Sequence, residues 1–371
     1  MVTQVYVCME VAGCPTICQH CWAQGVPYPA MPIPDIAYVL EQASAACAAG
    51  GLSFAAYPMH EVAAHPEASA VVRLFARYPG DRSVDAGRPM YEPFSTTGVP
   101  LALRPDWEEV LATCRELGST VVWPAVHGRA ETHDRMVHRV GAYQETLVGI
   151  DCARAAGMKV GCNVFLTHEN VAHFDGLVED LLVHGVTQFS VEPASFLPTA
   201  RSRRYEVLRP TLADLAPLVE RVRALLGPFF GCEIWSDLTA YTEAAYVRRA
   251  LEGTWPPPLR PVVEEVTLVC RPNLDLYWGL AGRYRRRYGN LRGEDAQDVF
   301  RTALADLAER PAPTDAEEPD DAIWFTLDPL PCVRELAECH GDPTSERVHF
   351  WARSLRYRWL DLAQRTATPA A

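Results

Sequence analysis

Strand-like and helix-like segments alternate through the first half of the chain, and this alternation limits the fold more than any other feature. Short apolar runs typical of strands are each followed by a longer amphipathic stretch typical of a helix. The predicted strands are residues 4–9, 52–57, 90–95, 120–126, 159–166 and 187–193, and the predicted helices are residues 36–49, 68–78, 107–117, 143–156 and 171–184. Six strands in this arrangement predict an α/β fold, a partial (β/α)6 TIM-like barrel with its working residues at the carboxyl ends of the strands.

Three cysteines, Cys14, Cys18 and Cys21, follow the first predicted strand within eight residues. Soft thiolate ligands on one short loop suit an iron–sulfur cluster. A four-iron cluster normally takes one thiolate per iron, so three thiolates leave one iron open for chemistry. Zinc is the alternative metal, and it needs a fourth ligand, for which His20 and Cys8 are the nearby candidates.

The Cys-x3-Cys-x2-Cys spacing, with Trp22 directly after it, resembles the signature of the radical S-adenosylmethionine (radical SAM) superfamily. The resemblance implies one 4Fe-4S cluster held by Cys14, Cys18 and Cys21, whose open iron chelates the amino and carboxylate groups of S-adenosylmethionine (SAM). It also implies that an electron from the cluster cleaves SAM to a 5'-deoxyadenosyl radical. His20 is a departure, because the superfamily more often has a hydrocarbon aromatic residue before the third cysteine.

Segments at other predicted strand ends resemble the SAM-binding motifs of the same superfamily. Residues 59–67 lie where those proteins carry Gly-Gly-Glu-Pro and a His-Pro turn; Glu61, His65 and Pro66 match, while both glycines and the first proline are replaced. A carboxylate such as that of Glu61 suits the SAM ammonium, although a lone glutamate is also typical of a solvated helix start. The SAM contacts that the resemblance implies are Met59, His60, Glu61, Thr97, Gly98, Arg139, Asn163 and Glu192.

The longest resemblance is to radical SAM proteins of the peptide-maturase type, which carry SPASM or twitch extensions. It covers residues 126–134, 141–143, 156–160 and 167–170. Within it, His127, His133 and Asp134 are the candidate catalytic residues that face the substrate. Histidine and aspartate beside a turn also act as helix caps or solvated groups, so both roles are open.

The pattern changes near residue 266, where alternation and a turn at Pro272-Asn273 predict a β-hairpin over residues 266–278. With the Gly-Asn-Leu segment that follows, it resembles a SPASM/twitch extension, in which such a hairpin leads into a cysteine for an auxiliary cluster. Gly279 stands about where that cysteine belongs, so we expect one cluster. Helices are predicted at residues 212–226, 333–338 and 346–364. Buried structural cysteines, or a hydrogen-atom donor among them, are expected at Cys232, Cys270, Cys332 and Cys339.

The composition, with 49% hydrophobic and 22% charged residues, is that of an ordinary globular protein. The length of 371 residues allows two domains, which we place at 1–205 for the core barrel and 206–371 for a smaller α+β extension of hairpin and helices covering the barrel. A net charge of −13 argues against nonspecific binding to nucleic acid or anionic membranes. The chain has neither an apolar run of about 18 residues nor a signal-peptide layout, which predicts a cytoplasmic protein whose 12 cysteines stay reduced.

The resemblance to the radical SAM superfamily implies an enzyme that cleaves SAM reductively and abstracts a hydrogen atom from an unactivated carbon. A short peptide or a small-molecule natural-product intermediate is the expected substrate, because the cysteine motif begins at residue 14 and we expect no leader-binding domain before it. Epimerisation, dehydrogenation, and carbon–carbon or thioether crosslinking are all open as outcomes. The expected partner is an electron donor such as flavodoxin or ferredoxin. The alternatives are a non-catalytic iron–sulfur or zinc protein and a degenerate binding module.

Overall fold

Parallel strands joined by helices form the first half of the fold. The computed structural model describes residues 4–21, 25–78, 94–193, 206–226, 242, 244, 265–280, 283–308 and 360–361. The parallel strands are β1 Gln4–Ala12, β2 Ser53–His60, β3 Phe94–Thr96, β4 Val121–Val126, β5 Lys159–Leu166 and β6 Gln188–Pro193. β1 pairs with β2 in one sheet, while β3, β4, β5 and β6 follow in order in the other, each parallel to its neighbour. The predicted α/β class and partial TIM-like barrel are confirmed.

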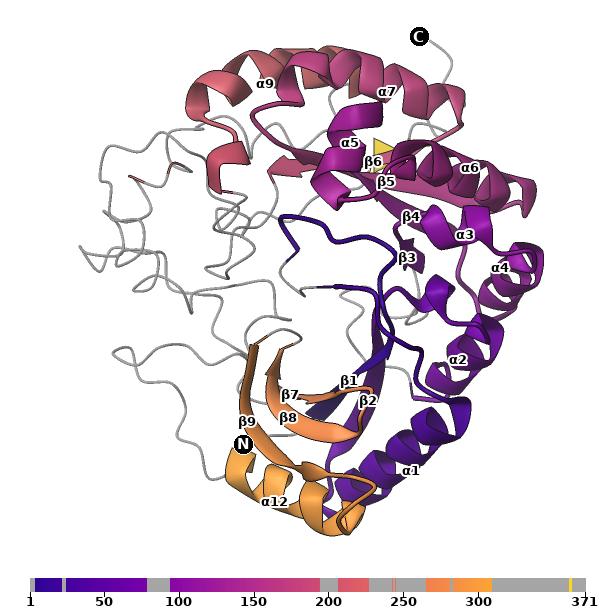
Figure 1. Cartoon of the computed structure of the whole chain (residues 1–371), viewed down its shortest axis with the longest axis vertical. Helices are drawn as coiled ribbons and strands as arrows, with labels where there is room; N and C mark the ends of the chain where they lie inside the picture. Colours follow the sequence, from indigo (N-terminus) through magenta and orange to yellow (C-terminus); the bar gives the residue numbers. More distant parts are fainter. Residues whose placement is uncertain are drawn as a thin grey trace, which may run out of the picture.

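The helices cover one side of the strands in an arc from α1 past α2 and α4 to α6 and α7 (Figure 1). Their bounds are α1 Ile33–Ala49, α2 Ala68–Phe75, α3 Val99–Leu103, α4 Trp107–Glu116, α5 Ala130–Val137, α6 Ala142–Ala155, α7 Phe174–Val183 and α9 Leu212–Leu226. Single turns of 3-10 helix occur at Val62–Ala64, Val171–His173 and Glu206–Leu208. Of the helices described, none combines the length and apolar character that crossing a membrane requires.

Hydrophobic periodicity explains these elements. In α1 the buried side chains recur every three or four residues, from Ile36 through Val39 and Leu40 to Ala43, which places them on one face. The helix ends at Gly50, and Gly51 then takes a positive φ of 67° that favours glycine. β1 is buried along almost its whole length, as expected for a strand covered on both faces.

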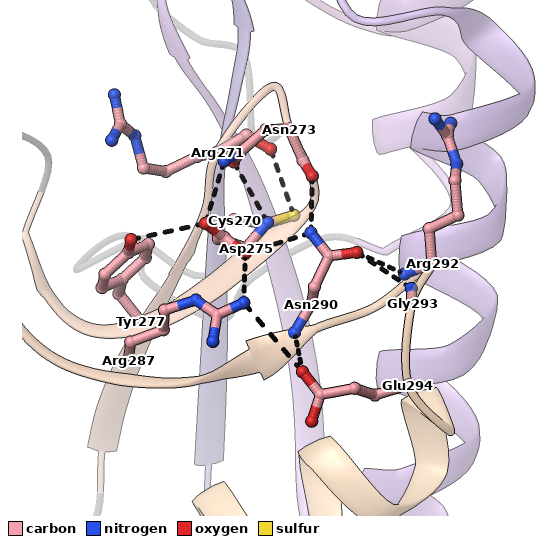
Figure 2. Close-up of polar contacts among 10 residues, drawn as sticks. All are labelled: Cys270, Arg271, Asn273, Asp275, Tyr277, Arg287, Asn290, Arg292, Gly293 and Glu294. Carbon is pink, nitrogen blue, oxygen red and sulfur yellow. Dashed lines mark hydrogen bonds and ion pairs between the residues drawn. The ribbon is translucent and has the colours of Figure 1, made fainter.

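A hairpin and a helix from the second half extend the first sheet. β7 (Glu265–Cys270) lies parallel to β1, and β8 (Asp275–Leu280) and β9 (Arg283–Asn290) continue antiparallel, giving the order β2-β1-β7-β8-β9. α12 (Ala296–Ala308) packs against α1 and β9. The predicted hairpin is confirmed, and Figure 2 shows the polar side chains that gather around its turn.

Several elements differ from the sequence-based prediction. α3, α5 and α12 were not predicted as helices, and β9 was not predicted as a strand. The predicted helix over residues 346–364 is wrong at Leu360–Asp361, which form β10 and pair antiparallel with β6. The edge of β6 presents unpaired backbone groups, and a two-residue strand satisfies some of them whatever the local helical pattern. The remainder of that helix and the one predicted over residues 333–338 lie outside the described residues.

Candidate functional site

The cysteine loop, residues 13–21, lies at the carboxyl end of β1 and is anchored on the end of α5. The backbone N–H groups of Ile17 and Gln19 donate to the carbonyls of Val137 and Met136, at 2.9 and 3.0 Å. Carbonyls in the last turn of a helix have no partner within the helix, so the loop supplies the donors that they need. A helix that the sequence did not predict therefore fixes where the loop sits.

Two of the three thiols lie close to Gly25. Its N–H donates to Cys21 Sγ at 3.4 Å, and a Cβ added at Gly25 would lie 2.7 Å from Cys14 Sγ. Cys18 lies elsewhere on the loop, with Thr16 Oγ1 3.6 Å from its Sγ, and it packs against a small apolar cluster. That cluster consists of Val99, Val137 and Ala142. All three thiols are partly buried.

The chemistry of the donors fits an iron–sulfur cluster, although the side chains do not converge on one point. Among the described residues, no three His, Cys, Asp or Glu side chains lie close enough together to hold a metal ion. Of the two candidates for a fourth zinc ligand, Cys8 is buried within β1, and the His20 ring packs against the rings of His127 and Phe165. The candidate metal ligands are therefore the three thiols of the cysteine loop.

Glu61 follows β2 and is buried to 1% exposure. Its Oε2 accepts the N–H of Thr97 at 2.5 Å, whereas its Oε1 has no hydrogen-bond partner in the part of the chain that the structure describes. Burial raises the pKa of Glu61, against the opposing effect of hydrogen bonds from Thr97 and Thr96. A buried carboxylate oxygen without a partner suits a cationic donor such as an ammonium group.

His60 and Tyr28 join the end of β2 to the segment after the cysteine loop. His60 has a φ of 66°, an uncommon conformation for a residue other than glycine, and its Nδ1 lies 2.6 Å from Tyr28 Oη. The His60 ring also approaches Gly25, since a Cβ there would lie 3.7 Å from His60 Cδ2. Met59, just before it on β2, is 8% exposed. Backbone strain of this kind is typical of functional sites.

The Thr97-Gly98 turn after β3 is held against α6. Gly98 has a φ of 82°, and a Cβ added at Gly149 would lie 2.3 Å from the Gly98 carbonyl oxygen. Thr146 Oγ1 donates to the Thr97 carbonyl at 2.9 Å, and the Thr97 N–H is bound to Glu61. Glycine is thus required on both sides of this contact, and the turn is fixed next to the buried carboxylate.

His127 and His133 belong to a buried group of rings beside the cysteine loop. The His127 ring centroid lies 4.5 Å from that of His20 and 5.5 Å from that of His133. His133 Nδ1 accepts the His127 N–H at 3.2 Å, so its own ring hydrogen is on Nε2. Burial, with His20 and His133 nearby, holds the pKa of His127 well below its usual value, and burial lowers the pKa of His133 to about 4. Both imidazoles are neutral at neutral pH.

Asp134 and Arg139 make contacts within the fold. The Asp134 carboxylate accepts the N–H groups of Gly141 and Tyr143, the latter at 2.8 Å, and so caps the start of α6. Arg139 forms a two-pronged pair with Glu145, with Nε–Oε2 and Nη2–Oε1 distances of 2.6 and 2.9 Å. Of the roles left open for Asp134, capping is the one that these contacts show, and the SAM contact implied for Arg139 remains a prediction.

The last two implied SAM contacts lie on neighbouring strands. Asn163, half-buried on β5, pairs in register with Ala125 of β4 and Ser190 of β6. Glu192 lies two residues further along β6, opposite Phe165. The sheet brings these positions near the strand ends, and their roles remain predictions.

The second-half cysteines lie largely outside the described residues. Cys270, on β7, is fully buried, as expected, and burial raises the pKa of its thiol. Cys232, Cys332 and Cys339 are among the residues not described. Gly279 lies on β8 opposite Tyr284.

Sequence reasoning missed two residues that shape this region, Tyr28 and Asn170. Tyr28 lies in a proline-rich stretch with no pattern to single it out. Asn170 ends the Thr167–Asn170 motif, which carried only a resemblance, and it proves to be 2% exposed with all its amide groups bonded. The available signal was an asparagine four residues after the strand predicted over residues 159–166.

No family model and no curated protein matches the chain. Among solved structures, histidine-tagged anSMEcpe with bound AdoMet matches with a TM-score of 0.51 at 11% identity, over 98% of this chain and 91% of that one. Streptococcus suis SuiB matches with a TM-score of 0.44 at 15% identity, over 81% of this chain but only 65% of SuiB. Escherichia coli coproporphyrinogen III oxidase (HemN), described as a radical SAM enzyme, matches with a TM-score of 0.44 at 15% identity, over 61% of this chain and 52% of that one. Of these three, the match to anSMEcpe carries the likeness, and it is a likeness of fold.

Proposed function

We propose that this chain is a radical SAM enzyme, in which Cys14, Cys18 and Cys21 hold a 4Fe-4S cluster and SAM binds beside them. The observation that carries the proposal is a three-thiol loop after β1 and, after the adjacent strand β2, a buried Glu61 with one oxygen that lacks a partner among the described residues. The fold shared with anSMEcpe, a protein solved with bound AdoMet, supports it. Such folds carry their active sites at the carboxyl ends of the strands.

Each proposed role follows from the local contacts. The sulfurs of Cys14 and Cys21 both lie close to Gly25, so both could bind one cluster there. Glu61 Oε1 would accept the SAM ammonium, with its other oxygen fixed by Thr97. When bound, the cluster would supply the electron that cleaves SAM to methionine and a 5'-deoxyadenosyl radical. The buried rings around His127 exclude water from that side of the loop.

The substrate that we propose is a short peptide or a small-molecule natural-product intermediate, from which a hydrogen atom is abstracted at an unactivated carbon. One fold can serve many substrates, so the likeness to anSMEcpe does not select among them. Epimerisation, dehydrogenation and crosslinking all begin with that abstraction. An electron donor such as flavodoxin or ferredoxin would be required in each case.

A structural metal site is the competing function. The observation in its favour is the donor set itself, because thiols on one loop also suit structural zinc. In that case the loop would hold zinc or a cluster as a staple, and SAM would not bind. The replaced glycines before Glu61 would fit the same conclusion, or a binding module that has lost turnover.

Anaerobic reconstitution separates these functions. The expected result is a brown protein with about four irons per chain, a reduced-cluster EPR signal that changes when SAM is added, and 5'-deoxyadenosine after reduction with SAM present. Cys152→Ala, which removes a partly buried cysteine of α6, is the control for loss of a thiol outside the loop. A colourless protein that retains zinc, or an iron–sulfur protein that leaves SAM intact, would overturn the proposal.

A further inference from the structure

Asn170 bridges the strand ends of β4 and β5 from a position with 2% exposure. Its Nδ2 donates to the carbonyls of His127 and Phe165, at 2.8 and 2.7 Å, and its Oδ1 accepts the Thr167 N–H at 2.8 Å. The ladder between the two strands ends one residue earlier, at the pair Val126 and Val164. One side-chain amide thus replaces backbone pairing where the strands part.

The two residues held in this way carry stacked rings. His127 and Phe165 lie with their centroids 5.3 Å apart and their planes 12° from parallel. The His20 ring packs against both, at 4.5 and 4.7 Å between centroids. Because His20 lies between Cys18 and Cys21, this three-ring wall of His20, His127 and Phe165 bears directly on the cysteine loop.

The loop is therefore supported from two sides. α5 holds its first part through the backbone of Ile17 and Gln19. The three-ring wall holds the part next to Cys21 through a side chain, and the spacing of that wall depends on a single amide with two donors. Replacing the donor nitrogen by an oxygen would set a lone pair against two carbonyl oxygens, so aspartate cannot take the place of asparagine.

We propose that Asn170 is a positioning residue for the cysteine loop, which acts through the His127–Phe165 pair on His20 to fix where Cys21 and a ligand beside it lie. This inference rests on the proposed function for the cluster and SAM, but its mechanical part concerns the loop alone. Removal of the amide lets the wall shift and frees the Cys21 side of the loop, while the contacts to α5 hold the other side.

Asn170→Asp and Asn170→Ala test this, with Asn290→Ala as the matched control. The side-chain amide of Asn170, with its hydrogen bonds to two carbonyls and one N–H, is called the amide staple. Asn290 forms a similar staple at the hairpin, where its Nδ2 donates to the Asn273 carbonyl at 2.8 Å and its Oδ1 accepts the Gly293 N–H at 2.9 Å (Figure 2). His127→Leu keeps the staple, whose acceptor is a backbone carbonyl, and removes the ring. It therefore covers the case in which an Asn170 variant fails to fold.

The first measurement uses the metal-free full chain, with iodoacetamide labelling followed site by site by mass spectrometry. Alkylation of Cys21 should become about fivefold faster in the Asn170 variants and in His127→Leu, as expected for loss of about 1 kcal/mol of support, while Cys21 in Asn290→Ala reacts at the wild-type rate. The Asn170 variants can be as destabilised as Asn290→Ala and still alkylate Cys21 at the wild-type rate. In that case Asn170 would have only a structural role, and the inference would be overturned.

The second measurement uses reconstituted protein. The Asn170 variants should retain iron but show an altered EPR spectrum with SAM and about fivefold weaker SAM binding, neither of which Asn290→Ala should show. Wild-type spectra and SAM affinity in the variants would count against the inference. If the wild type binds no cluster while Cys21 labelling responds as expected, the proposed function fails and the positioning role stands.

Discussion

The site at the strand ends, which contains the cysteine loop and Glu61, and the hairpin turn around Asp275 each contain a polar network. The acidic side chains of the two networks are bonded in opposite ways. At the hairpin, the Asp275 carboxylate is bonded to Arg287, Asn290 and Asn273, at 2.8, 3.0 and 2.8 Å, and the hydrogen bond from Arg287 leads the effects that lower its pKa (Figure 2). At the strand ends, burial raises the pKa of Glu61, and one of its oxygens has no partner among the described residues. An acid with every oxygen bonded stabilises the fold, whereas a buried acid left incomplete is suited to a ligand.

The backbone does not follow the same contrast. The hairpin turn is closed by hydrogen bonds between Arg271 and Asp275 and between Leu274 and Arg271, and Leu274 takes a positive φ of 65° there. At the strand ends, His60 is held at a positive φ beside the thiols. Positive-φ backbone thus occurs in both regions, and the incompletely bonded acid is what distinguishes the site where we propose the chemistry.

Cys18→Ala should have the largest effect, because it removes one of three thiol ligands. We expect loss of the cluster and of SAM cleavage to background, while the side chain's small apolar surroundings accept alanine and the protein stays folded. Iron content and 5'-deoxyadenosine formation measure it, with Cys152→Ala as the control. SAM cleavage retained in Cys18→Ala would mean that the cysteine loop, like the hairpin turn, has no catalytic role.

Glu61→Gln should come next and should separate binding from stability. Loss of the charge at the buried carboxylate should weaken SAM binding about tenfold to hundredfold, since a hydrogen bond to a charged group contributes about 1.5–3 kcal/mol. The thermal midpoint should stay the same or rise, because a desolvated charge has been removed. Calorimetry and thermal unfolding measure both. Glu131→Gln, at an exposed acid of α5, is the control, and a lower midpoint with unchanged SAM affinity would make Glu61 structural.

Tyr28→Phe should have a smaller effect at the same site. It removes the hydroxyl that lies 2.6 Å from His60 Nδ1, so the strained end of β2 loses one restraint. We expect iron loss to a chelator to become about threefold faster, in line with one neutral hydrogen bond. Tyr38→Phe, on α1, removes a hydroxyl bonded to the Leu291 carbonyl and should leave iron loss unchanged. Equal rates in both variants would contradict the prediction.

Asp275→Asn should leave the strand-end site untouched and change only how stability depends on pH. The pKa of Asp275 is lower in the folded protein than its usual 3.8, so its stabilising effect is present above that value and is lost as the pH falls through the folded pKa. The variant should lose about 1 kcal/mol near neutral pH and show a shallower fall of its thermal midpoint in acid than the wild type. SAM affinity should not change. Asp298→Asn, at an exposed acid of α12, is the control, and parallel midpoint curves for wild type and Asp275→Asn would refute the assignment.

Much of the fold followed from local pattern. The apolar spacing of α9 and the buried run of β5 were predicted with the bounds that the structure gives. α5 was missed because its sequence, AETHDRMV, has too few apolar residues to show helical periodicity. The strand at Leu360–Asp361 arises from pairing with β6, which no local signal reports.

At the candidate site, residues close in sequence were found and contacts between distant segments were not. The three cysteines lie on one loop, so their spacing named them as ligands directly. The bond between Glu61 and Thr97 joins residues 36 apart, and the staple from Asn170 to His127 joins residues 43 apart. Both depend on the order of strands in the sheets, which side-chain type alone does not reveal.

The sequence by itself determined the alternation of strand and helix, the position of the thiols and the candidate acid, because these depend on periodicity and on neighbours along the chain. The tertiary structure decided that α5 and a three-ring wall hold the cysteine loop, that Asp134 caps α6, and that Glu61 is buried with one oxygen unpaired among the described residues. Burial and pairing are properties of surfaces brought together from distant segments. They exist only once the sheets have formed.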